Sequence, residues 1–194
     1  MTAQRLLLAS TSPYRRELLE RLRVPFETVS PDCDETARSG EGPADLVTRL
    51  ARDKAASVAG HERDAIVIGS DQVAALGDRI LTKPGNHETA FEQLRASSGA
   101  SVVFHTGLAL IDSTSGREAC VRVDYTVDFR DLGDDEIERY LTAEAPWDCA
   151  GSIRSEGYGI VLFRRMHGDD PTALIGLPLI QLRTLLSDFG WPLP

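Results

Sequence analysis

The stretch LLLASTSPYRRELL, residues 6–19, contains a complete strand–turn–helix unit. The apolar residues 6–9 predict a short buried strand that breaks at the polar residues 10–12. Ser12 as N-cap, with Pro13 at the first helical position, predicts the start of a helix. A strand that leads directly into a helix is typical of an α/β domain.

Outward from this unit, the chain alternates further predicted strands and helices. The apolar run 65–69 is typical of a central strand, and we expect residues 70–72 at its end. Loops are expected at 32–42 and at 146–159, the second long enough to be functional. The other predicted strands are 26–29, 79–82, 102–111, 119–129 and 160–166, and the other predicted helices are 43–59, 87–97, 179–189 and one opening at 134.

These elements predict an α/β fold with a mixed central β-sheet flanked by helices, in a single domain spanning residues 1–194. Hydrophobic residues make up 42% of the chain, which is enough for a normal core. No apolar run approaches the roughly 20 residues that span a bilayer, and residues 6–9 are too short for a signal peptide. We therefore expect no membrane partner and a cytoplasmic location.

Charge and cysteine content exclude two further classes of protein. The net charge of −9 would repel a nucleic acid from most of the surface, so none is expected as a partner. The three cysteines, Cys33, Cys120 and Cys149, are far apart and form no CxxC pair or Cys/His cluster. Structural zinc and a disulfide framework are therefore disfavoured, and reduced thiols are expected.

The turn at residues 10–16 is the first candidate site. A helix N-terminus presents free backbone N–H groups and a partial positive charge. The hydroxyls of Ser10 and Ser12, with the guanidinium of Arg15, would complete an anion cradle. The alternative is an ordinary capped helix with solvated arginines.

Acidic residues supply the second group of candidates. The adjacent Asp34 and Glu35 could hold a hard divalent cation, or be merely solvated loop residues. Asp71, expected where a buried strand ends, suits a metal ligand or a general base for water. The alternative is an aspartate that simply favours a turn.

Two lysines complete the set. Lys54 lies in the middle of the predicted helix 43–59, and Lys83 comes directly before a rigid Pro-Gly bend. Each could instead be an ordinary surface residue. Together with the carboxylates and the cradle, they provide what hydrolysis of a phosphoanhydride requires: a metal site, cations for phosphate charge and a poised water.

In this order, several segments resemble the signature blocks of the Maf-type nucleotide pyrophosphatases. They are LASTSPYRRELL, the Asp34–Glu35 pair, RLARDKA, VIGSDQV, KPGN, ASSG, HTGLAL, CAGS and IGLPL, and they run from Leu6 to about Leu186. The resemblance implies a fold similar to the inosine triphosphate pyrophosphatases, with two lobes around a deep cleft. It also implies a divalent cation and a pyrophosphate-releasing cut of small nucleotides that are non-standard or modified. The oxygen ligands and the lack of a Cys/His cluster favour a hard cation, magnesium or manganese.

The resemblance also implies roles for individual residues. Asp71 matches the family's proton acceptor, and Glu35 matches an acidic metal- or water-binding position, so both are expected metal ligands. Ser10, Arg15, Lys54 and Lys83 match polar phosphate-binding positions, while Arg16 lies where the family tolerates other residues.

Three positions track the family's division by substrate, and here they are Tyr14, Gln72 and Glu156. The branch acting on thymidine and uridine triphosphates carries Arg, Thr and Gln there, so this set is similar to the branch that hydrolyses 7-methyl-GTP. The segment CAGSIRSEGYGI resembles that branch too. Methylation makes the guanine cationic, so Tyr14 could attract it by cation–π stacking, worth about 0.5–2 kcal/mol, and Glu156 could accept its N–H donors.

Two other functions stay open at this stage. One is the dTTP/UTP pyrophosphatase activity of the sister branch, against which Gln72 and Glu156 argue. The other is a non-catalytic nucleotide-binding regulator of cell division, which would not need Asp71 together with Glu35. A homodimer and the role of Trp191, packed on the body or on a partner, are left open.

Overall fold

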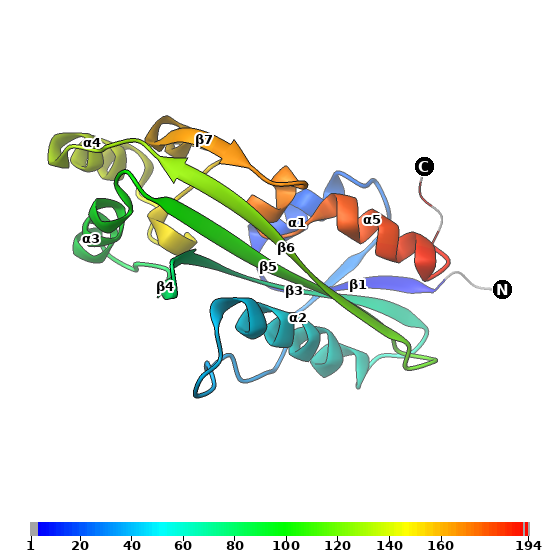
Figure 1. Cartoon of the computed structure of the whole chain (residues 1–194). Coiled ribbons are helices and arrows are strands. Elements are labelled where there is room, and N and C mark those ends of the chain that lie inside the picture. Colours follow the sequence, from blue (N-terminus) through cyan, green and yellow to red (C-terminus); the bar gives the residue numbers. More distant parts are fainter. Residues whose placement is uncertain (1–3, 192, 194) are drawn as a thin grey trace.

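A computed structural model describes residues 4–191 and 193. Over these residues the chain forms a seven-stranded mixed sheet in the order β2-β1-β3-β5-β6-β7, with β4 paired to β3 (Figure 1). The strands are β1 (Arg5–Ala9), β2 (Glu27–Val29), β3 (Ala65–Leu76), β4 (Arg79–Leu81), β5 (Ser101–Asp112), β6 (Glu118–Phe129) and β7 (Phe163–His167). β1 runs parallel to β2 and β3, while β3–β4, β3–β5, β5–β6 and β6–β7 are antiparallel. The predicted mixed α/β class is confirmed.

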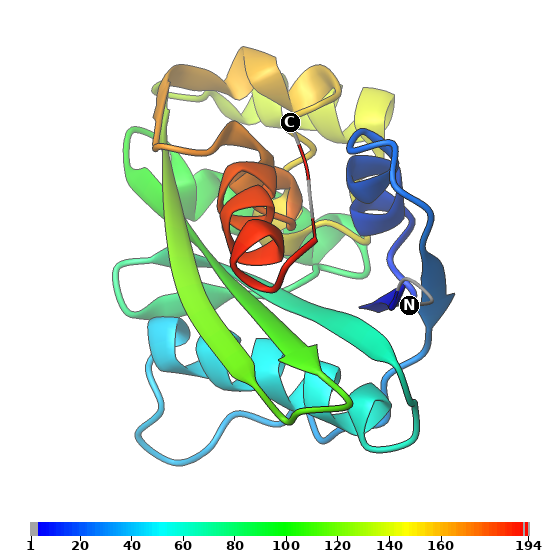
Figure 2. The same cartoon turned by 90° about the vertical axis from the view of Figure 1, so that its right-hand side faces the viewer.

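The helices are α1 (Pro13–Glu20), α2 (Pro43–Ala59), α3 (His87–Ser97), α4 (Asp134–Glu144) and α5 (Leu179–Asp188), with short 3-10 helices at Ala150–Ser152, Tyr158–Leu162 and Pro171–Ile175. α2 covers one face of the sheet, and α1 and α5 cover the other (Figures 1 and 2). The alternation of β1 explains this layering: Leu6 and Leu8 pack with α1 and α5, whereas Leu7 packs with α2. None of these helices, within the described ranges, is both long and apolar enough to cross a membrane.

A separate hydrophobic core lies at the other end of the sheet. There α3 and α4 pack against the ends of β3, β5 and β6 around Tyr140, Phe129 and Phe104 (Figure 1). The long strands β3, β5 and β6 extend from the cores around α1, α2 and α5 into this one. The two ends correspond to the two lobes expected from the sequence.

Three expected boundaries were wrong. β3 extends to Leu76 instead of stopping at residue 69, so Ser70-Asp71-Gln72 lies within the strand because β5 pairs with β3 past this point. Pro25 predicts the end of the first helix, but α1 ends earlier, at Glu20, and Arg23 beyond it adopts φ +54°. β7 begins at Phe163 because Tyr158–Leu162 forms a 3-10 helix.

Two glycines determine how closely α2 approaches the sheet. A Cβ on Gly69 would lie 2.1 Å from the carbonyl oxygen of Ala51, and one on Gly107 would lie 2.1 Å from that of Val47. Both distances are far below van der Waals contact, so α2 rests directly on the backbone of β3 and β5. Since side chains two apart on a strand share a face, Asp71 faces α2 as Gly69 does.

Candidate active site

A cleft of about 650 Å³ opens between the two lobes, within the size range of small-molecule sites. Its walls are the turn between β1 and α1, the loop after β2, α2, the middle of β3 and the end of β4. All but one of the predicted site residues line it, namely Ser10, Ser12, Tyr14, Arg15, Glu35, Lys54, Asp71, Gln72 and Lys83. The remaining one, Glu156, lines an adjoining cavity that shares Tyr14, Arg15, Gln72 and Lys83.

Lys54 joins the two predicted acidic residues. Its ammonium donates to Asp71 Oδ1 at 2.7 Å and to Glu35 Oε2 at 2.9 Å. The side chains of Lys54 and Asp71 are only 7% and 10% exposed, whereas that of Glu35 is 58% exposed. Lys54 is therefore not the solvated helix lysine of the alternative interpretation, because it carries a buried charge paired with Asp71.

Asp34 does not act with Glu35 as a pair. Its Oδ1 accepts the backbone N–H of Thr36 at 2.9 Å, and this hydrogen bonding lowers the pKa of the carboxyl. Of the two neighbouring carboxylates, Glu35 lines the cleft and Asp34 does not. Asp34 instead stabilises its own turn, and a cation held by the pair stays a prediction.

A second charged cluster fixes the loop that carries Glu35. Arg49 on α2 donates to Glu41 from Nε at 2.6 Å and from Nη2 at 2.8 Å, and Nη2 also donates to the carbonyl of Thr36 at 3.0 Å. Such a two-pronged contact fixes orientation as well as distance. The residue next to Glu35 is thus attached to the same helix that carries Lys54.

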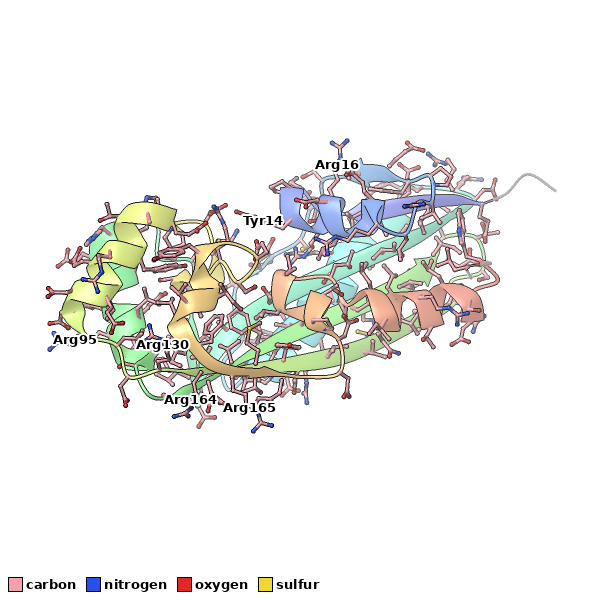
Figure 3. The ribbon with its side chains drawn as sticks, turned by 90° about the horizontal axis from the view of Figure 1, so that it is seen from above. Tyr14, Arg16, Arg95, Arg130, Arg164 and Arg165 are labelled. Carbon is pink, nitrogen blue, oxygen red and sulfur yellow. The ribbon has the colours of Figure 1, made fainter. Side chains whose placement is uncertain are left out.

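The turn before α1 contains the N-cap that the sequence predicts at Ser12, and both serine hydroxyls take part in it. Ser12 caps the helix by accepting from Arg15 N at 3.4 Å, and Ser10 Oγ accepts from Ser12 N at 3.1 Å. Each oxygen accepts within the turn, which leaves each O–H proton free to donate to an anion in the cleft. Arg16 instead pairs with Glu20 on the exposed side of α1 and points away from Tyr14 in Figure 3.

Arg15 is held by the IGLPL block, residues 175–179, to which the sequence assigned no contact with the candidate site. Its Nε donates to the carbonyl of Gly176 at 2.9 Å, and Ser70 Oγ donates to the same oxygen at 2.9 Å. Desolvation lowers the pKa of the guanidinium, while the nearby carboxylates of Asp71 and Glu35 raise it, and arginine keeps its charge in proteins. The buried carboxylate of Asp170 fixes this segment by accepting from Thr172 N and Ile180 N.

Gln72 is hydrogen bonded to the residues just before this block. Its Nε2 donates to the carbonyls of Ala173 and Leu174 and to Thr106 Oγ1. Because both amide protons are used, Gln72 can meet a substrate only through its oxygen. It lines the cleft as expected, although its donors face the protein.

Tyr14 meets residues that sequence reasoning missed. Its hydroxyl donates to Asp148 Oδ2 at 3.1 Å and accepts from Arg154 Nη2 at 2.8 Å. Arg154 also pairs with Glu144 at 3.0 Å, and its guanidinium lies 5.7 Å from the centre of the Tyr14 ring. Burial raises the pKa of Tyr14 to about 12, so the hydroxyl is protonated at neutral pH. Figure 3 shows Tyr14 directed from α1 toward the segment after α4.

The sequence of this chain matches the family described as Maf-like protein over residues 5–189. The chain belongs to the Maf-like protein family. It is 53% identical to a protein of Nitrosococcus oceani, covering 96% of this chain and 94% of the relative, and 53% identical to one of Pseudomonas aeruginosa, covering 97% and 98%. Both relatives are named 7-methyl-GTP pyrophosphatase. A HAM1 protein from Coxiella burnetii shares 16% identity and a TM-score of 0.47 over 95% of this chain and 99% of its own, too little to carry an argument.

Glu35 and Asp71 are carboxylates in the cleft of this Maf-like chain that could hold a divalent cation. Within the described residues, no group of three or more His, Cys, Asp or Glu could hold a metal by itself. Glu35 and Asp71 each place one oxygen on Lys54 and keep the other off it. Magnesium is commonly held by one or two carboxylates plus substrate phosphates, so this pair fits a metal that arrives with a nucleotide.

Proposed function

We propose that this chain hydrolyses 7-methyl-GTP to 7-methyl-GMP and pyrophosphate. The observation that carries the proposal is the buried Lys54–Asp71 pair, which lies in a cleft where cationic and hydroxyl donors converge. The names of the relatives, at 53% identity over nearly the whole chain, support the same reaction.

Asp71 is the proposed proton acceptor for water. One oxygen is fixed by Lys54, and in the part of the chain that the structure describes the other oxygen, Oδ2, has no hydrogen-bond partner. A rigidly held carboxylate with one open oxygen can orient a water and take its proton as the water attacks the α-phosphorus. Because Asp71 lies within β3 and faces α2, its position depends on packed elements of the fold.

Three cations, Lys54 on α2, Arg15 on α1 and Lys83 after β4, would offset the charge of the leaving pyrophosphate. Arg15 has its Nε on Gly176 and lines the cleft, and Lys83 lines it from the end of β4. The hydroxyls of Ser10 and Ser12 add neutral donors at the start of α1. Donors placed in advance around developing charge stabilise a transition state without reorganising.

A divalent cation, magnesium or manganese, belongs to this proposal. Glu35 would hold it through the oxygen that Lys54 leaves free, and Asp71 through one lone pair of Oδ2, with the other lone pair of that oxygen facing the water. When bound, such an ion supplies neutralisation of phosphate charge and polarises the bond to the leaving group.

Specificity would come from the end of the cleft around Tyr14. Beside this ring Arg154 pairs with Glu144 and Asp148, and Glu156 lines the adjoining cavity together with Asp148, Arg15 and Lys83. The carboxylates of Asp148 and Glu156 would attract a cationic base, and the Tyr14 ring offers it a face. Plain GTP, with a neutral base, would gain less.

The test is pyrophosphate release by the purified protein with magnesium or manganese across 7-methyl-GTP, GTP, UTP, dTTP, CTP and ITP. A preference for 7-methyl-GTP is expected. A preference for UTP or dTTP would keep the mechanism and refute the specificity. If the folded protein released no pyrophosphate from any of these substrates, the result would instead favour a non-catalytic nucleotide-binding regulator. The cytoplasmic location and the homodimer stay predictions, which fractionation and light scattering would test.

A further inference from the structure

Two segments at the rim of the cleft come from different parts of the chain. Residues 82–85 carry Lys83, and residues 147–156 carry Arg154 and Glu156. They are hydrogen bonded directly once, from Gly85 N to the carbonyl of Trp147 at 3.0 Å. The first segment belongs to the proposed phosphate end, and the second to the proposed base end.

Gln93 on α3 is hydrogen bonded to both of these segments. Its Nε2 donates to the carbonyl of Thr82 at 3.0 Å, and its Oε1 accepts from Ser152 Oγ at 2.7 Å. The side chain is 5% exposed. Since Thr82 directly precedes Lys83, one buried amide restrains both the lysine turn and the base-end segment.

Ser152 adopts a backbone conformation that needs such support. Its φ is +61°, directly after Gly151 at +66°, and the residue is fully buried. A non-glycine residue in the left-handed region persists only where its surroundings determine it. Here Gln93 holds its side chain, and Tyr140 holds its carbonyl by donating to it at 3.2 Å.

The hydrogen-bond network continues from Ser152 to the base end. Tyr140, 1% exposed, also accepts the backbone N–H of Arg154 at 3.1 Å, and the guanidinium of Arg154 donates to Tyr14. The network thus runs from Thr82, the residue before Lys83, through Gln93, Ser152 and Tyr140 to Arg154 and Tyr14, where Arg154 Nε is buried without a hydrogen-bond partner among the described residues. Buried hydrogen bonds of this kind restrain the groups that they join.

We propose that Gln93 is a positioning residue that sets the spacing between Lys83 and the base-end segment around Arg154 and Glu156. It touches no substrate and acts through Thr82 and Ser152. This inference rests on the proposed function. Its consequence is that turnover and base selectivity are coupled, because one side chain holds both ends of the nucleotide site.

The main test replaces Gln93 with a residue of similar length that neither donates nor accepts. Gln93→Met is expected to lower kcat/KM for 7-methyl-GTP about tenfold, equivalent to about 1.4 kcal/mol, and to shrink the preference over GTP. The assays are run well below each variant's melting temperature.

Ser97→Ala is the matched control. Ser97 lies on the same helix, is fully buried, and donates to the backbone carbonyl of Gln93 at 2.8 Å without reaching the cleft. It should lower the melting temperature and leave both kinetic readouts unchanged. Equal kinetic losses in Gln93→Met and Ser97→Ala would overturn the positioning role.

Gln93→Glu provides a pH-dependent rescue. A carboxylate can still accept from Ser152, but it donates to Thr82 only when protonated. The selectivity for 7-methyl-GTP over GTP should therefore recover as pH falls in this variant, and stay low in Gln93→Met. A ratio in Gln93→Glu that does not change with pH would contradict the inference.

Hydrogen exchange tests the coupling without any catalysis. Gln93→Met should speed exchange of backbone amides in both 82–85 and 147–156, whereas Ser97→Ala should leave the second segment protected. Faster exchange in one segment alone would refute the proposed coupling. This readout separates the two ideas: a wild-type enzyme that cleaves no nucleotide refutes the proposed function, while the exchange pattern still decides the role of Gln93.

Discussion

The two ends of the cleft are formed by different kinds of structural element. At the catalytic end, Lys54 and Asp71 come from α2 and β3, and their side chains are 7% and 10% exposed. At the base end, Asp148 and Glu156 come from the segment after α4, and both are exposed, Asp148 at 59%. A helix and a strand in contact place charged groups more rigidly than a surface segment does, which suits chemistry that all substrates share. Surface segments tolerate change, which suits the choice of base.

Asp71→Asn should have the largest effect. The amide keeps the shape but cannot take a proton, so turnover of 7-methyl-GTP should fall about 10²-fold or more. Steady-state kinetics measure this, with Asp124→Asn as control because Asp124 is a strand aspartate paired with His105 and Arg122 outside the cleft lining. Near-normal turnover in folded Asp71→Asn protein would remove Asp71 from its role.

Lys83→Ala should come next. A charged hydrogen bond contributes about 1.5–3 kcal/mol, so its loss should lower kcat about 10- to 100-fold. Lys83 is exposed, so the melting temperature should hardly change. An unchanged rate with a lowered melting temperature would point to a structural lysine instead.

Two substitutions at the base end should change selectivity more than rate. Tyr14→Leu removes a cation–π contact of about 0.5–2 kcal/mol, and Glu156→Gln removes a negative charge. The ratio of kcat/KM for 7-methyl-GTP over GTP should therefore fall about 2- to 30-fold in Tyr14→Leu, and less in Glu156→Gln. If Glu156→Gln keeps the full preference, the charge argument fails.

The smallest effect concerns pH and the loop that carries Glu35. Hydrogen bonds from Arg49 lower the pKa of Glu41 to about 2. A lowered folded-state pKa gives stability that is present above the unfolded value, about 4.5, and lost as pH falls toward 2. The protection factors of the amides of residues 34–42, which are the intrinsic exchange rates at each pH divided by the observed rates, should therefore fall between pH 4.5 and 2 in the wild type. In Glu41→Gln they should be low throughout, while Glu118→Gln, which breaks a similar pair with Arg52 on the same helix, should not alter them.

Local signals in the sequence predicted most of the fold. The Ser12 cap, the Pro43 helix start and the apolar runs of β1 and β3 are each visible within a few residues. The full length of β3 could not be read this way, because residues 70–76 stay in the sheet through pairing with β5 and β4, which lie far along the chain.

The candidate site shows the same contrast between local signals and contacts made far along the chain. Single residues were identified through the family resemblance, yet Arg154, Asp148, Asp170 and Gln93 were missed. An arginine or glutamine gains its role from a partner on another element, as Arg154 does from Tyr14, 140 positions away. One signal was available in the sequence, because two of the missed residues lie close to segments already noted. Arg154 lies two residues before Glu156, and Gln93 lies three residues before the ASSG block.

The absence of a side chain at Gly69 and at Gly107 has a practical consequence for mutational screens. An alanine at either position would push α2 off the sheet and carry Lys54 away from Asp71, while the leucine-rich cores around α1 and α5 stayed packed. In a library selected for activity alone, these two glycines would score beside the acid–base residues. A parallel selection for abundance would separate the two glycines from Asp71, because displacing α2 also opens the core around Leu7, Ala51 and Val67, whereas Asp71→Asn leaves that core intact.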